Sequence, residues 1–476
     1  MPQPHGKNYD VIIIGAGISG LVCGCYLAKG GMKVLLAEQH FKPGGYCTAF
    51  KRGGFTFDAA AHCFGGYRKN GVTKKIFKDL GIERRLKIKK NDPSDTVITP
   101  DYRISYWADI DKTIEEFNNF FPQEANNVKK FFSFLLNPDP SSFSRMRHGT
   151  FKDLLDQYFA NETLKTLLSA PLLGLGGLPP ALMSAFIGAK LFSEFLLDGG
   201  YHPVGGMQAL PNALAERFKE LGGELLLSCP IKKIKVEDNE VRGVIFKNGG
   251  FASAPFVVSN CDARQTFLKL LGSKMIEKEF YLKLKSMTPS ISNFIVYLGL
   301  DGYFKSLSKP GTTICSFQHY DLNRAYRSIR EANMERYGGY MYYVSQDIPT
   351  VLAIIPAPYK NRSYWKNNKR QFLNSFIDRL EQYSIPGLKK HIIYKDAATP
   401  QTLHRYTANY RGASFGWAGT PSQLALSDFK KPSFVKGLYL TGHWTTHGLG
   451  ISGVVYVGHD IAQMILRKRR NVINPD

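Results

Sequence analysis

Three glycines close to the N-terminus, Gly15, Gly17 and Gly20, have the spacing G-x-G-x-x-G, which is typical of sites that bind the phosphates of a dinucleotide. In such sites the first glycine permits a tight turn, and the second lets the backbone approach a pyrophosphate. The third lets a helix pack closely on a strand. Glu38 can accept hydrogen bonds from the hydroxyls of a ribose. These residues together predict a nucleotide site.

The sequence around these residues predicts a strand, a helix and a second strand. Residues 9–14 form an apolar run rich in β-branched side chains, which favours a buried parallel strand. Residues 21–29 favour a helix, and residues 33–38 favour a second strand that ends at Glu38. The N-terminus of the helix would offer free N–H groups and the positive end of its dipole to the phosphates.

Five further segments, spread over both ends and the middle of the chain, follow the pattern of one group of proteins. On these segments, the glycine motif and Glu38, the sequence resembles the flavin amine oxidase and phytoene desaturase superfamily. Within it, the sequence is most similar to bacterial carotenoid desaturases, carotenoid isomerases and retinol saturases. The five segments are residues 42–46 (KPGGY), 54–58 (GFTFD), 201–207 (YHPVGGM), 257–262 (VVSNCD) and 437–442 (GLYLTG).

The sequence departs from the desaturase pattern at two positions of its last loop. His447 and Ser452 stand where desaturases typically carry proline. Residues 46–50 and 57–62 are more similar to retinol saturases than to desaturases. Isomerisation and reduction of a double bond therefore stay open beside desaturation.

The resemblance implies that the nucleotide is FAD, held by segments from both ends of the chain, and it implies no metal. The N-terminal motif would bind the ADP half, Ile231 would place its backbone near the adenine, and the last segment would surround the flavin ring. The flavin itself would carry out the redox step, so the protein supplies orientation and electrostatics. The implied cofactor-binding residues are Gly15, Gly17, Ser19, Gly20, Glu38, Gln39, Gly44, Gly45, Tyr46, Ile231, Gly442, Gly450, Ile451 and Val454.

A second match to the glycine pattern occurs at Gly448, Gly450 and Gly453. It also follows a predicted strand and opens a predicted helix over residues 453–467, but no second strand and no acidic residue follow it. We therefore do not expect a second dinucleotide. Instead, the N-terminus of this helix is expected to face the flavin ring, where its dipole would stabilise negative charge on the reduced flavin.

Three histidines, His62, His443 and His447, lie in segments expected near the flavin. An imidazole can exchange a proton near neutral pH, so each is a candidate acid–base residue. The alternative for each is a hydrogen bond that serves structure or flavin contact.

The formal net charge of +23, from 62 Lys and Arg against 39 Asp and Glu, favours an anionic partner. The basic residues are scattered and belong to no recognisable nucleic-acid motif, so we expect no nucleic acid and predict an anionic membrane surface. Residues 467–470 (RKRR) follow an apolar helix and could contact such a surface. A solvated basic surface and a solvated helix end are the alternatives.

No charged residue occurs between Lys165 and Lys190. That length could cross a bilayer, but Pro171, Pro179 and Pro180 would leave backbone groups without partners in lipid. We expect broken helices here that line an apolar cavity or enter one leaflet.

The seven cysteines include no Cys-x-x-Cys pair and form neither a disulfide framework nor a zinc site. A reducing compartment fits this usage. The first eight residues are polar and contain no apolar signal region. These features predict a cytoplasmic protein that is peripheral on the inner face of the membrane.

The predicted fold is α/β: a Rossmann-like FAD-binding domain, discontinuous over three chain segments, with an inserted α+β substrate domain. The three segments are residues 9–75, 200–288 and 400–470. Residues 76–199 and 289–399 make the insertion, and residues 74–201 are expected to be mainly helical. Their aromatic side chains at helical spacing favour a helix–helix core.

The leading functional prediction is an FAD-dependent oxidoreductase for a long apolar polyene or isoprenoid, acting as a desaturase, saturase or isomerase. The substrate would enter a tunnel lined by the helical insertion, and the electron partner is open. One alternative keeps the fold but oxidises a polar amine. Another is a flavin-free prenyl-binding protein of the GDP-dissociation-inhibitor type, which the segment at Pro43, Gly44 and Gly45 argues against.

Overall fold

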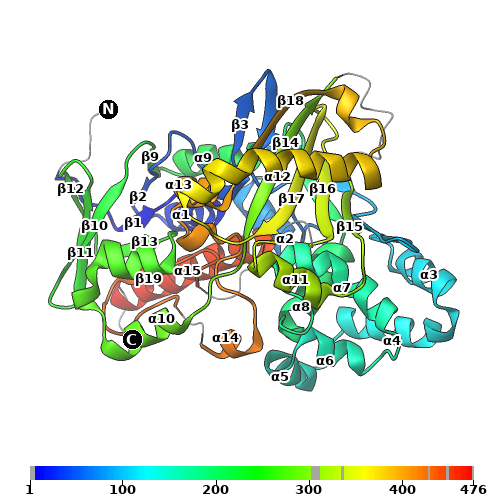
Figure 1. Ribbon diagram of the computed structural model, residues 1–476. Coiled ribbons are helices and arrows are strands. Elements are labelled where there is room, and N and C mark those ends of the chain that lie inside the picture. The colour runs from blue at the N-terminus through cyan, green and yellow to red at the C-terminus, as the bar shows by residue number, and fades with distance from the viewer. Residues whose placement is uncertain (1–5, 302–310, 334–336, 427–428, 446–449, 474–476) are drawn as a thin grey trace.

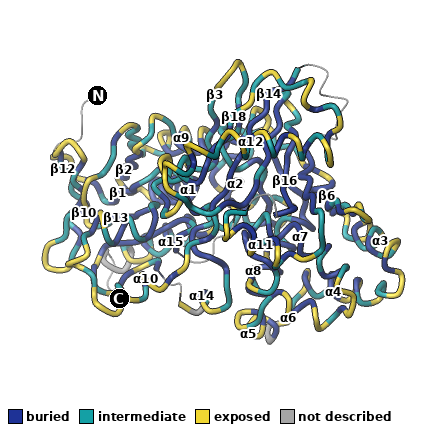
Figure 2. Tube along the Cα trace, viewed as in Figure 1, coloured by how far each residue is buried: buried dark blue, intermediate teal, exposed yellow. Residues whose placement is uncertain are grey.

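The computed structural model describes residues 6–301, 311–333, 337–426, 429–445 and 450–473. Two sheets organise these residues. A parallel sheet lies at one end of the molecule, and a larger mixed sheet with a lobe of short helices lies at the other (Figure 1). The buried residues follow these two sheets and the helices packed on them (Figure 2).

The parallel sheet takes its strands from three distant parts of the chain. It contains five strands in the order β19-β13-β1-β2-β9, and the described pairings are all parallel. Its central strand is buried because its side chains are apolar and β-branched. The strands are β1 (Val11–Ile14), β2 (Val34–Ala37), β9 (Glu224–Leu226), β13 (Phe256–Ser259) and β19 (Leu438–Leu440).

Helix α1 (Ile18–Lys29) packs on this sheet and against helix α15 (Gly450–Ile473). The two helices approach closely because small residues face each other: a Cβ on Gly458 would lie 2.5 Å from the carbonyl oxygen of Ser19. Helices α2 (Val72–Leu80) and α9 (Ala209–Glu220) pack beside them.

The mixed sheet has seven strands in the order β18-β14-β17-β16-β15-β6-β7. Helix α12 (Arg362–Tyr383) crosses one face (Figure 1), where Trp365 stacks on Phe294 of β14. The strands are β6 (Asp95–Ile98), β7 (Arg103–Tyr106), β14 (Ser292–Leu300), β15 (Thr313–Phe317), β16 (Gly339–Val344), β17 (Thr350–Ala357) and β18 (Ile392–Ala398).

The helical lobe packs its aromatic residues into the same core as the mixed sheet, as their spacing predicted. The uncharged segment forms α7, which contains Pro171, and α8. The lobe comprises α3 (Ile110–Phe120), α4 (Ala125–Leu136), α5 (Pro140–His148), α6 (Phe151–Asp156), α7 (Glu162–Gly176) and α8 (Ala185–Leu191).

The expectation that residues 74–201 are mainly helical was incomplete. They also contain β6, β7 and β5 (Ile88–Asn91), and β5 pairs with β8 (Gly200–Pro203). These strands are four residues long and rich in polar side chains, so their sequence shows no clear alternation. The partners β8 of β5 and β15 of β6 also lie more than one hundred residues away in the chain.

The remaining strands form two small antiparallel sheets, β3-β4 and β10-β11-β12. Their bounds are β3 (Ala49–Arg52), β4 (Phe55–Asp58), β10 (Ile231–Glu237), β11 (Glu240–Phe246) and β12 (Phe251–Ser253). The other α-helices of the described residues are α10 (Lys278–Ser286), α11 (Leu322–Arg330), α13 (Pro400–Thr407) and α14 (Pro421–Leu426).

The close approach of α15 to α1 predicts that Gly458→Ala is destabilising. The added methyl group would push against the backbone of α1, so we expect the free energy of unfolding to fall by about 1–3 kcal/mol. Urea unfolding followed by circular dichroism measures it. Gly149→Ala is the control, because the nearest atom there is 3.5 Å away. Equal stability of the two variants would contradict the packing described.

Candidate active site

One cavity of about 950 Å³ extends from the carboxyl edge of the parallel sheet to the face of the mixed sheet. This volume is at the upper end of the range for ligand pockets, roughly 300–1,000 Å³. Residues that follow four strands of the parallel sheet line its inner half, which is where α/β sheets bind nucleotides. These residues include Gly15, Glu38, Asn260 and Gly442.

The N-terminus of α1 points its first turn into this inner half. Gly17 is its N-cap residue, no side chain caps the helix, and its first turn contains no acidic residue. Gly44, with a φ of +132°, lies against this turn and donates its N–H to the carbonyl of Ala16 over 2.8 Å. An uncapped helix start beside bare glycine backbone fits a pyrophosphate.

Asn260 holds the two glycine segments together, and the sequence did not single it out. Its Nδ2 donates to the carbonyl oxygen of Gly15 over 3.2 Å. A Cβ on Gly17 would lie 2.8 Å from Asn260 Nδ2, and one on Gly442 would lie 2.5 Å from Asn260 Oδ1. The signal was the segment VVSNCD, which contains this residue, but the pattern assigned it no role.

Gly20 is the one predicted cofactor residue that does not line the cavity. A Cβ there would lie 2.3 Å from the carbonyl oxygen of Gly15. The lack of a side chain at Gly20 therefore lets helix α1 pack closely on strand β1.

Glu38 is buried at the far end of the inner half. Its carboxylate accepts hydrogen bonds from the backbone N–H of Ala16 at 2.7 Å and of His40 at 2.9 Å. Each carboxylate oxygen keeps a lone pair for a further donor. Gln39 and Ile231 line the same end of the cavity. Gln39 is exposed, so this end reaches solvent.

The C-terminal segment forms the opposite wall of the inner half. Ser19 of α1 is joined to Thr441 by a hydrogen bond of 2.7 Å between their hydroxyls. Gly450, Ile451 and Val454 line the cavity at the start of α15, which begins before the expected residue 453. His447 lies outside the described residues.

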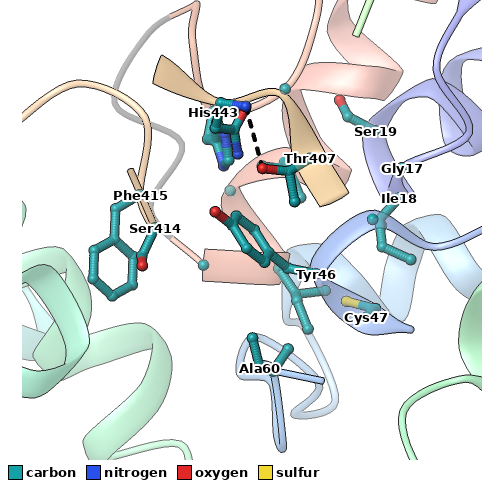
Figure 3. A pocket seen from close by; sticks show the side chains of 18 of the residues that line it. Gly17, Ile18, Ser19, Tyr46, Cys47, Ala60, Thr407, Ser414, Phe415 and His443 are labelled. Carbon is teal, nitrogen blue, oxygen red and sulfur yellow. Dashed lines mark hydrogen bonds between the residues drawn. The ribbon is translucent and has the colours of Figure 1, made fainter. Parts of the chain in front are cut away.

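Tyr46 points into the space between His443, Thr407 and Ala60 (Figure 3). Its hydroxyl donates to the carbonyl of Ala413 over 2.9 Å, and its ring centroid is 6.2 Å from that of His443. Gly45 precedes it on the same wall. Burial lowers the pKa of His443 to about 4, so the imidazole is neutral at pH 7 and able to accept a proton.

His62 lines the cavity from another direction. Its Nε2 lies 3.1 Å from the hydroxyl of Thr313 on β15, and its ring centroid lies 4.9 Å from that of Tyr343 on β16, with the rings tilted by 35°. Burial lowers the pKa of His62 to about 4 as well. Two of the three predicted histidines therefore reach one cavity as neutral imidazoles.

The outer half of the cavity is mainly apolar. Helices α7 and α8 form one side, and the mixed sheet forms the other. Its rim carries the exposed side chains of Phe143, Arg147, Lys190 and Tyr456. The apolar wall includes Leu175, Phe186, Ile187, Leu191, Ile295, Met341, Ile354 and Phe415.

Comparison with known proteins identifies the family. The family described as flavin containing amine oxidoreductase matches residues 18–466. The chain belongs to this family. Its relatives include a prolycopene isomerase of Daucus carota, 27% identical over 95% of this chain and 79% of that protein. They also include the all-trans-retinol 13,14-reductase of Danio rerio, 24% identical over 92% and 82%. A lycopene-forming phytoene desaturase of Pseudescherichia vulneris is 24% identical over 96% and 98%.

Solved structures show the same fold at low identity. An oxidoreductase from Methanosarcina mazei has a TM-score of 0.68 at 15% identity, covering 95% of this chain and 100% of that one. The cyclohexylamine oxidase of Brevibacterium oxydans has a TM-score of 0.66 at 16% identity, covering 97% and 99%. The fold is the mixed α/β fold of FAD-binding amine oxidase-type oxidoreductases.

The family member described here is an FAD-dependent oxidoreductase. Its residues fit the cofactor: the uncapped start of α1, the glycines whose Cβ atoms would collide with Asn260, and the acid at the far end share one cavity. The family and this fit to FAD argue against the alternative of a flavin-free prenyl-binding protein.

Because Asn260 joins the two glycine segments, Asn260→Ala should weaken FAD binding about tenfold. The variant loses a hydrogen bond of about 1 kcal/mol and the packing that sets the glycine backbone. Titration of the FAD-stripped protein, followed by quenching of flavin fluorescence, measures the dissociation constant. Asn212→Ala, on the exposed face of α9, is the control. An unchanged dissociation constant for Asn260→Ala would remove this role.

Proposed function

We propose that this FAD-dependent oxidoreductase acts on a long apolar polyene or isoprenoid, of carotenoid or retinoid type, as a desaturase, saturase or isomerase. The observation that carries the proposal is the apolar outer half of the cavity, which continues directly from the proposed flavin site. The named activities of the relatives, isomerisation of prolycopene, reduction of all-trans-retinol and desaturation of phytoene, support the same substrate class.

The charges near the outer half argue against an amine substrate. Glu194 is a carboxylate on this wall, and it is paired with Arg68 at 3.1 Å and with Lys190 at 3.6 Å. A cationic amine would have to compete with both of these cations. The neutral, apolar wall fits a hydrocarbon chain better.

When bound, FAD supplies the hydride chemistry. In the proposal, Glu38 and the start of α1 hold the adenosine and the pyrophosphate, while Tyr46 and the start of α15 hold the ring. The positive end of α15 favours negative charge beside it. His62 and His443 are the proposed proton acceptors, because burial keeps both imidazoles neutral.

We also propose the division of the chain into two domains. Residues 9–75, 200–288 and 400–470 would form a discontinuous Rossmann-like FAD-binding domain, because the five strands of the parallel sheet come from these segments. Residues 76–199 and 289–399 would form the substrate domain around the mixed sheet.

The apolar wall predicts how a polar substitution affects the substrate. Ile354 of β17 faces the cavity, so Ile354→Asn should weaken polyene binding by about 1–3 kcal/mol and leave the FAD content unchanged. Ile354→Leu, which keeps the volume and polarity, is the control. Binding is measured by mass spectrometry of co-purified lipids and by anaerobic flavin absorbance changes with added polyenes. The proposal would be contradicted if the protein reacted with amines and neither oxidised, reduced nor isomerised any polyene.

The partner surface is proposed to be an anionic membrane at the rim of the cavity, on the cytoplasmic side. Phe143 and Tyr456 are 43% and 51% exposed there, beside the cations Arg147 and Lys190. Such a mixture suits a lipid surface. None of the helices in the described ranges is long and apolar enough to span a membrane.

The basic C-terminal cluster lies away from this rim. Lys468 packs over the ring of Phe256, and Arg469 donates to the carbonyl of Gly30 at 3.4 Å. With a rise of 1.5 Å per residue, Lys468 is about 27 Å along α15 from Gly450. The rim is therefore the better candidate for the surface that meets lipid.

A vesicle flotation experiment tests the rim. The double variant Phe143→Ser with Tyr456→Ser removes the two exposed aromatic side chains of the rim, which are 43% and 51% exposed and lie on α5 and α15. It should float several-fold less with vesicles that contain anionic phospholipid at low salt. Leu282→Ser, 56% exposed on α10, is the control. Flotation equal to that of the unmodified protein would exclude the rim as the membrane surface.

A further inference from the structure

A group of buried polar side chains lies behind His62, between the cavity and the opposite surface of the protein. His202 of β8 places its Nδ1 3.0 Å from the carbonyl oxygen of His62, and its ring is 5.9 Å from that of Tyr343. The ring of Tyr343 in turn packs against that of His62. Three titratable rings from three parts of the chain therefore meet in one buried place.

Three polar atoms of this group have no hydrogen-bond partner among the described residues. They are Nδ1 of His62, Nε2 of His202, which is 1% exposed, and the hydroxyl of Tyr343, which is 3% exposed. A buried polar atom without a partner costs about 1–3 kcal/mol of stability. A phenylalanine at position 343 would avoid that cost, so packing does not explain the hydroxyl.

A second, small cavity adjoins Tyr343 and shares no lining residue with the main cavity. Its volume is about 20 Å³, and Asp58 and Asp347 line it together with Tyr343. A volume above roughly 10–15 Å³ with two or more polar partners can hold one water. Asp58 accepts one hydrogen bond, from the N–H of Met207 at 2.8 Å, so its carboxyl group can contact such a water.

Asp347 connects this small cavity to solvent. Its side chain is 23% exposed and forms an ion pair of 2.6 Å with Lys89. Lys89 lies opposite His202 in the β5–β8 pair, so the charges of Asp347 and Lys89 act on the same imidazole. Buried polar groups thus extend from the main cavity to the surface.

Desaturation and saturation, two of the three proposed reactions, require such a connection. Forming a C=C bond from a C–C bond removes two hydrogens: the flavin accepts one with an electron pair as a hydride, and the other leaves as a proton. Saturation runs the same balance in reverse, while isomerisation has no net proton change. With a hydrocarbon in the outer half of the cavity and lipid at its rim, a proton has no polar path to solvent past the rim.

We propose that His62, His202 and Tyr343, with one water between Asp58 and Asp347, carry this proton between the active site and solvent. The proposal rests on the proposed function, since it takes the reaction from there. His62 would exchange the proton with the substrate, and the other residues would pass it on. The route leaves the protein on the face of β5 and β8.

The ionisation of the surrounding groups agrees with a two-way route. Burial raises the pKa of Asp58 to about 7, so it can give or take a proton near neutral pH. Burial lowers the pKa of His62 to about 4 and also lowers that of His202. Asp95, whose pKa burial raises to about 7, faces the other side of the group with the buried thiols Cys63 and Cys315.

Tyr343→Phe removes the hydroxyl alone and separates a proton route from a structural role. Because the hydroxyl has no partner in the described residues, a structural role predicts equal or greater stability and unchanged rates. The proton route predicts equal or greater stability, unchanged FAD binding, and at least tenfold slower flavin reduction or oxidation by the polyene in single turnover. The solvent deuterium isotope effect on that step should also increase.

Tyr342→Phe is the matched control, because the neighbouring residue of β16 points to the opposite face of the strand. It should leave the rate unchanged. A crystal structure of the FAD-loaded protein adds a readout without turnover: an ordered water within hydrogen-bond distance of Tyr343 Oη and an Asp58 oxygen. That water should be lost or displaced in Tyr343→Phe.

Two results would overturn the route. One is Tyr343→Phe with the rate and isotope effect of Tyr342→Phe, which leaves the proposed function intact. The other is an FAD-loaded structure without the bridging water. If no polyene is desaturated, saturated or isomerised, the proposed function fails instead, and the presence or absence of the water still decides whether the small cavity is built to hold one.

Discussion

The whole site depends on one constraint: parallel strands from distant parts of the chain end at the same edge of one sheet. Residues that follow β1, β13 and β19 meet there around the amide of Asn260, which bonds to Gly15 and lies against Gly17 and Gly442. A side chain on Gly17 or Gly442 would occupy the place of the amide. The absence of side chains at these glycines therefore makes room for Asn260 as well as for a phosphate. The residues that would hold the cofactor and the edge of the sheet form one packed structure.

Much of this could be predicted from the sequence, because it depends on local patterns. Apolar β-branched runs indicated β1 and β13, and the glycine spacing placed the start of α1. The segment around Tyr46 and the start of α15 were expected near the same cofactor, and both line the one cavity. Patterns of this kind transfer because each is set by a turn or a helix end within a few residues.

The parts that could not be predicted depend on contacts over long distances in the chain. Strands β6 and β7 join the mixed sheet only because β15, more than two hundred residues later, supplies the neighbouring edge. Likewise, nothing near Tyr343 indicates that His62 and His202 lie beside it. Contacts between distant parts of the chain decide such positions, and a single sequence gives little indication of those contacts.

The length and placement of α15 have a consequence for how the protein is made. This helix closes the cofactor cavity at one end, and at the other Leu466 packs against Gly30 at the end of α1. The edge strand β19 and α15 are synthesised some four hundred residues after the glycine motif they complete. On the ribosome, the N-terminal half of the nucleotide fold must therefore wait with its apolar face uncovered. We therefore expect cofactor loading to be a late event, and apolar surface exposed in this way makes a partly synthesised chain prone to aggregation.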